Sequence, residues 1–173
     1  MGVLPGSKVL DWSVCQSLSV RDQLRTGARF LDVRLTKYNG VIYTAHGTRD
    51  KLTVRGVSFQ HLLTENINFL KNHPGEVLVW TFLWEFGPSY WPEVELTLEM
   101  FKDQYFYTGS EDPLQLSLSQ LAGKILICRE GENNLQQFRT LDCQGSWSQT
   151  NSKDPVTLGR SLQNYSYYYK NHP

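Results

Sequence analysis

Residues 77–83 read Val-Leu-Val-Trp-Thr-Phe-Leu, an almost continuous apolar run that follows the helix-stopping pair Pro74-Gly75. A strand with one face in water alternates apolar and polar residues, whereas a strand covered on both faces is apolar nearly throughout. The stretch therefore predicts a buried strand of a parallel sheet.

Strand patterns also occur on both sides of this run, at residues 30–35, 41–45 and 125–128. The first of them alternates with a period of two, so Asp32 and Arg34 share one face of the strand. A turn is expected at Asn39-Gly40. Residues 48–57 read as a polar loop.

Helix signals fill most of the intervals between these strands. Residues 19–22 have the spacing of a capping box, and Ser58 suits the cap of a helix that ends at Pro74. Residues 91–107 fit either a helix or a strand. We favour the helix because Pro92 suits a first helical turn and a crossover is needed there.

Strands that alternate with helical crossovers indicate an α/β architecture with parallel pairing. An open sheet and a closed barrel both fit this pattern. The inward-facing charges of Asp32 and Arg34 favour a TIM-type barrel with its site at the carboxyl ends of the strands. The chain of 173 residues has the length of a single domain.

The composition narrows the choice of partners and compartment. The 17 basic and 17 acidic residues balance, which argues against nucleic acid as a partner. No stretch approaches the roughly 20 apolar residues of a membrane span, and no signal peptide is evident, so we expect a cytoplasmic protein. Cys15, Cys128 and Cys143 are odd in number and lack a CxxC pattern. We therefore expect reduced thiols and no zinc site.

Two residues near the ends of consecutive strand candidates have the chemistry of a phosphodiester site. The guanidinium of Arg34 can bind two phosphate oxygens, and the imidazole of His46 can give a proton to a leaving alkoxide. In a parallel barrel both would stand at the same mouth, with Asp32 holding Arg34 in place. The alternative is structural, since an Asp-x-Arg pair is more often an ion pair and a His before Gly a turn residue.

Several motifs in order resemble the phosphatidylinositol-specific phospholipase C (PI-PLC) X domain, and most closely the small eukaryotic X-domain-containing proteins. They are residues 12–24, 27–35, His46-Gly47, 69–74, 76–80 and 121–127. The resemblance is clearest over residues 12–130, whereas residues 131–173 are poorly defined. We therefore expect one partial domain over residues 1–173.

The resemblance implies a barrel that splits the bond between phosphate and diacylglycerol. Arg34 matches the phosphate-supporting arginine of the metal-independent members, Asp32 its acidic neighbour and His46 the general acid. No cofactor or metal is implied. A phosphoinositide or other glycerophosphodiester headgroup is the expected partner, with transient contact to a membrane surface.

The chain departs from the family pattern at both ends. Residues 4–9 read Leu-Pro-Gly-Ser-Lys-Val, where members usually carry a Pro-Gly-Ser/Thr-His motif whose histidine is the general base. An eight-stranded barrel needs at least about 200 residues. We therefore expect a partial or unclosed barrel with impaired catalysis, which fits a fragment or splice form of a longer enzyme.

Two other functions remain open on the sequence. A non-catalytic module would bind phosphoinositide headgroups through Arg34 and nearby cations such as Arg129. A glycerophosphodiester phosphodiesterase would use a metal held by carboxylates at strand ends, where Glu85 and Glu130 stand.

Overall fold

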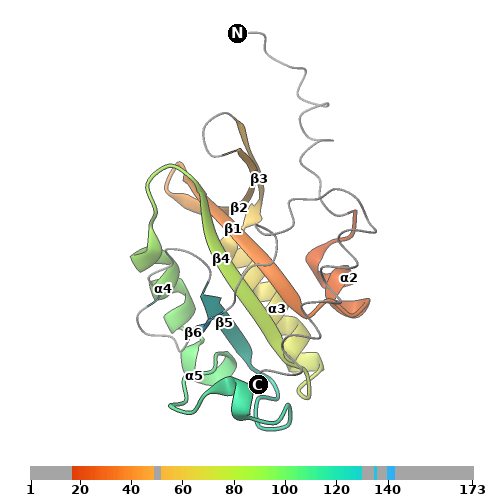
Figure 1. Ribbon diagram of the computed structural model, residues 1–173. Coiled ribbons are helices and arrows are strands. Elements are labelled where there is room, and N and C mark those ends of the chain that lie inside the picture. The colour runs from red at the N-terminus through yellow and green to blue at the C-terminus, as the bar shows by residue number, and fades with distance from the viewer. Residues whose placement is uncertain (1–16, 49–51, 130–134, 136–139, 143–173) are drawn as a thin grey trace, which may run out of the picture. The chain divides into compact units, whose positions relative to one another are not determined.

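The computed structural model describes residues 17–48, 52–129, 135 and 140–142 (Figure 1). The chain divides into two units, Met1–Cys143 and Gln144–Pro173, and all described residues belong to the first. Predictions on residues 4–9, on Glu130 and on most of the segment after it lie outside the described residues.

Most of the predicted elements are present. The helices are α2 (Val20–Arg25), α3 (Phe59–Asn72), α4 (Trp91–Glu99) and α5 (Lys102–Tyr105), with a short 3₁₀ turn at Pro113–Gln115. The strands are β1 (Phe30–Tyr38), β2 (Val41–Thr48), β3 (Leu52–Ser58), β4 (Leu78–Phe86), β5 (Ile125–Arg129) and β6 (Thr140–Asp142). The helix favoured for residues 91–107 is confirmed as two helices, α4 and α5. None of the described helices is long and apolar enough to cross a bilayer.

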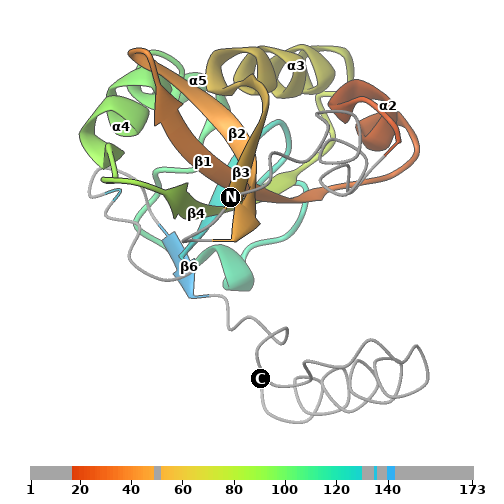
Figure 2. The same cartoon turned by 90° about the horizontal axis from the view of Figure 1, so that it is seen from above.

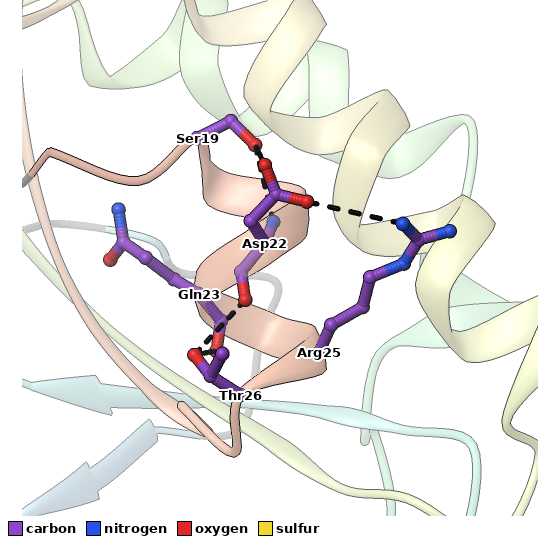
Figure 3. A network of polar contacts seen from close by, with 5 residues as sticks. All are labelled: Ser19, Asp22, Gln23, Arg25 and Thr26. Carbon is purple, nitrogen blue, oxygen red and sulfur yellow. Dashed lines mark hydrogen bonds and ion pairs between the residues drawn. The ribbon is translucent and has the colours of Figure 1, made fainter.

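The predicted helix start is present, with Ser19 as the N-cap of α2 (Figure 3). The Ser19 hydroxyl accepts a hydrogen bond from the Asp22 backbone N–H at 3.2 Å and donates one to the Asp22 carboxylate at 2.7 Å. At the other end, the Thr26 hydroxyl donates to the Asp22 carbonyl at 3.0 Å, and Gly27 follows with φ of 109°. A positive φ suits glycine, which explains why α2 ends there.

The strands form one sheet in the order β3-β2-β1-β4-β5-β6. The pairs β1–β4 and β4–β5 are parallel, as the sequence predicts, and β5 also pairs in parallel with β6, a strand that was not predicted from the sequence. The pairs β1–β2 and β2–β3 are antiparallel. Within the described residues β3 and β6 are the two edges, so the sheet is mixed and unclosed.

The prediction that the strands of Arg34 and His46 run parallel is wrong. Asn39 and Gly40 both have positive φ, 47° and 80°, and they form a two-residue turn between β1 and β2. Two positive φ values define the hairpin turn whose twist matches antiparallel strands, and Asn-Gly is its preferred sequence. Parallel strands would need a crossover of a dozen or more residues.

The polar loop predicted for residues 48–57 is also wrong, because most of it is strand β3. Partners shift from Tyr43↔Ser58 to Ala45↔Arg55, so β3 carries one extra residue in a β-bulge opposite Thr44. A Cβ added to Gly56 would lie 2.5 Å from the Thr44 hydroxyl, so any other residue would require the Thr44 side chain to move. The glycine and the polar residues that resemble a loop are thus features of a bulged edge strand.

One face of the sheet is covered by helices, as Figure 2 shows for α2, α3 and α4. The central strand β4 contributes Trp80 and Phe82 to the core, both fully buried. The Trp80 indole donates a hydrogen bond to the buried Asn66 side chain of α3 at 3.3 Å. The opposite face, here called the interior face, has a smaller apolar cluster that includes Leu121, Leu126 and Cys128.

Cys128 corrects the expectation of reduced thiols. It is fully buried in β5 and disulfide-bonded. Cys15 and Cys143 lie outside the described residues.

Arg29 ties the beginnings of β1 and β4 together. Its Nε donates to the Glu76 carboxylate at 2.7 Å, and its Nη1 donates to the Leu24 carbonyl at 2.7 Å. The guanidinium also lies over the Phe69 ring, 4.7 Å from the centroid. The hydrogen bond from Arg29 lowers the pKa of Glu76, and the positive charge of Arg29 adds to the effect.

This lowered pKa predicts a dependence of stability on pH. Because the folded-state pKa of Glu76 lies below its unfolded value, the Arg29–Glu76 contribution is complete above the unfolded pKa and is lost as pH falls through the folded pKa. In Glu76→Gln, urea unfolding should therefore show a smaller loss of stability on acidification. Glu99→Gln, at an exposed position of α4, is the control and should follow the wild type. Equal acid sensitivity of Glu76→Gln and wild type would contradict the prediction.

Candidate functional site

Between Asp32 and Thr36 the interior face of β1 is polar, whereas its other face is apolar. Val33 and Leu35 are buried in the core against the helices. Asp32, Arg34 and Thr36 alternate with them and so project from the interior face. The predicted sharing of a face by Asp32 and Arg34 is therefore confirmed by their contact, with the Arg34 Nε and Nη2 both 3.0 Å from Asp32 Oδ2.

A β-bulge next to this pair involves Glu85 of β4. Leu35 pairs with Trp84, but Thr36 pairs with Phe86, so Glu85 has no partner in β1. The Thr36 hydroxyl donates to the Phe86 carbonyl at 3.2 Å and holds the shifted register. Bulges often redirect a side chain beside a site. Here the Glu85 side chain is only 3% exposed.

The buried Glu85 carboxylate joins three strands. Its Oε2 lies 3.6 Å from Nη1 of Arg34 in β1, and its Oε1 accepts a hydrogen bond from the Gly47 N–H in β2 at 2.9 Å. Arg34 is thus held between Asp32 and Glu85, with 32% of its side chain exposed. A guanidinium that is held by two carboxylates and still partly exposed is prepared to bind an oxyanion.

His46 directly precedes Gly47, but strand alternation places its side chain on the face opposite that of Tyr43 and Ala45, so its ring does not join this network. The β1–β2 pairs end at Leu35↔Thr44, and His46 pairs with Val54 of β3 two residues further on. The side chain is exposed, and it forms no hydrogen bond or ion pair with any described residue. Its link to Arg34 runs through the neighbouring Gly47 amide and Glu85. The general-acid role of His46 stays a prediction.

Arg129 is the last residue of β5, which runs parallel to β4. Its backbone therefore ends at the same edge of the sheet as that of β4, where carboxyl-end sites form. Its side chain lies outside the described atoms, so its role in headgroup binding stays a prediction.

Glu85 is the site residue that sequence reasoning underrated, because it was considered only as a metal ligand. One signal was available in the sequence. A carboxylate near the end of the most apolar strand is expected to be buried, and a buried charge requires a partner. Within the described ranges no group of three or more His, Cys, Asp or Glu is placed to hold a metal ion.

The sequence is similar to one curated protein in particular. Over 86 residues the chain is 33% identical to PI-PLC X domain-containing protein 1 of Mus musculus, covering 44% of this chain and 22% of that protein. No model of a known protein family matches the chain.

Solved structures with a similar fold are bacterial phospholipases. The phosphatidylinositol-specific phospholipase C of Listeria monocytogenes superposes with a TM-score of 0.55 at 23% identity, covering 73% of this chain and 46% of that one. The Staphylococcus aureus enzyme, in a structure concerned with modulation of its membrane binding, gives 0.60 at 19% identity, covering 79% and 46%.

The chain thus spans less than half the length of the relatives it matches. It resembles a PI-PLC X-domain protein in part of its sequence, and its described fold is a partial, unclosed barrel of the PI-PLC kind. In such a barrel the helices lie outside, and the face that carries Asp32, Arg34 and Glu85 lines the interior.

The two roles of Glu85 can be separated by substitution. Glu85→Ala removes both the ion pair and the acceptor for Gly47, so it should lower the free energy of unfolding by about 1–3 kcal/mol. Glu85→Gln keeps an acceptor oxygen and should lose less. Urea unfolding measures both, with Glu99→Ala as the exposed control. Equal losses in the two variants would show that the Gly47 hydrogen bond contributes nothing.

Proposed function

We propose that this chain binds the phosphate group of a phosphoinositide or related glycerophosphodiester headgroup at Arg34, and that it does so with little or no turnover. The observation that carries the proposal is the guanidinium of Arg34, fixed by Asp32 and Glu85 on the interior face and still 32% exposed.

The chemistry of Arg34 supports phosphate as the bound group. An arginine held by carboxylates keeps its charge and presents a planar set of N–H donors that matches two phosphate oxygens. The relatives support the class of headgroup, since the names of those with a similar fold specify phosphatidylinositol.

The sequence departs from the family pattern at one of the two proton-transfer positions, which supports the proposal of impaired catalysis. In a phospholipase C reaction, the inositol 2-hydroxyl attacks phosphorus while a base takes its proton and an acid protonates the leaving oxygen. His46 has the chemistry of the acid. Lys8 occupies the position at which the family pattern has the general-base histidine. Loss of a general base lowers the rate about 10²- to 10⁴-fold.

Binding and turnover of the same headgroup test the proposal. Inositol 1-phosphate should bind the wild type, and Arg34→Gln should weaken it about tenfold or more because a charged hydrogen-bond donor is lost. Arg21→Gln, at an exposed position of α2, is the matched control and should bind like the wild type. Calorimetric titration measures all three.

Turnover is followed as inositol phosphate released from phosphatidylinositol vesicles. We expect no release above background from the wild type and no change in His46→Ala. Release that His46→Ala abolishes would overturn the proposed lack of turnover. Unchanged binding by Arg34→Gln would overturn Arg34 as the phosphate site.

A further inference from the structure

The charge around Arg34 sets a condition on anion binding. Asp32 and Glu85 both contact its guanidinium, so the three side chains together carry a net charge of about −1 when ionised. A phosphate that approaches Arg34 meets the repulsion of both carboxylates. We therefore expect that tight binding of a phosphate at Arg34 requires another cation on the same face of the sheet.

Arg55 of β3 is such a cation. Its guanidinium carbon lies 3.7 Å from the centroid of the Tyr38 ring and 5.6 Å from that of Tyr43. The pair Thr36↔Tyr43 places both tyrosines on the face of Thr36, because Tyr38 is two residues beyond Thr36 in β1. Arg34 is two residues before Thr36, so Arg55 lies over the interior face that carries Arg34.

The strand register also brings the two arginines close together. Arg55 pairs with Ala45. Ala45 follows Thr44, which forms the last β1–β2 pair with Leu35, so Ala45 is level with Arg34. Arg34 and Arg55 are thus on nearly the same row of the sheet, two strands or roughly 10 Å apart. This register places the two backbones, and the Arg55 side chain extends from its row toward Tyr43 and Tyr38.

Arg55 differs from Arg34 in its partners. Its side chain is exposed and forms no ion pair or hydrogen bond with any described residue. Stacking on an aromatic ring holds the guanidinium plane in place while leaving its N–H edge open. Arg55 therefore offers a positive charge that no carboxylate among the described residues compensates.

We propose that Arg55, held by Tyr38 and Tyr43, forms a second phosphate-binding position beside Arg34. The inference rests on the proposed function, because it assumes that Arg34 binds the first phosphate. The ligand is a phosphate group, carried either by the same headgroup or by a neighbouring lipid.

Three ligands compared on wild type and Arg55→Gln test this position. They are inositol 1-phosphate, inositol 1,4-bisphosphate, and phosphatidylcholine vesicles with and without phosphatidylinositol. If the second phosphate belongs to the same headgroup, the wild type should prefer the bisphosphate on the order of fivefold, and Arg55→Gln should lose that preference. If it belongs to a neighbouring lipid, Arg55→Gln should weaken only vesicle binding, by a similar factor.

Two results would overturn the second position and can be told apart. Binding of inositol 1-phosphate that depends on Arg34, with every Arg55→Gln titration unchanged, removes the second position and leaves the proposed function standing. No binding of inositol 1-phosphate by the wild type removes both. Arg21→Gln is the charge-matched control, and thermal unfolding of Arg55→Gln checks that the fold is retained.

Discussion

The buried carboxylate of Glu85 is the constraint on which the interior face depends. A carboxylate with 3% exposure is costly unless it is paired and hydrogen-bonded. Its two oxygens meet this requirement with different partners, the guanidinium of Arg34 and the backbone N–H of Gly47. Since these groups belong to β1 and β2, one side chain of β4 fixes how three strands meet.

Such a network contributes more to geometry than to net stability. The cost of burying a charge offsets most of the attraction between the partners, and an apolar residue of similar volume often does as well. What the pairing gives is a single position for Arg34, because Asp32 holds Nε and Nη2 while Glu85 faces Nη1. A preorganised guanidinium loses little freedom when a ligand binds.

The sequence predicts the local elements well and their pairing less well. Periodicity and caps locate β1, α3 and β4, because these depend on neighbours along the chain. The predicted direction of β2 is wrong. Asn39-Gly40 is the preferred sequence of a hairpin turn and indicates antiparallel strands, but the expectation of a parallel barrel was given more weight than this local signal. The role of Glu85 depends on a register shift between β1 and β4. The register between two strands that are distant in sequence cannot be predicted from the hydrophobic periodicity of either strand.

The antiparallel hairpin changes how the interior face is built. A parallel strand after β1 would have required a crossover, whereas the hairpin places β2 next to β1, with β3 on its far side. Tyr38 and Tyr43 thereby come to share a face across the turn, and the bulge at Gly56 sets the pairing of Ala45 with Arg55. Arg55 thus reaches that face through an antiparallel arrangement that parallel pairing would have excluded.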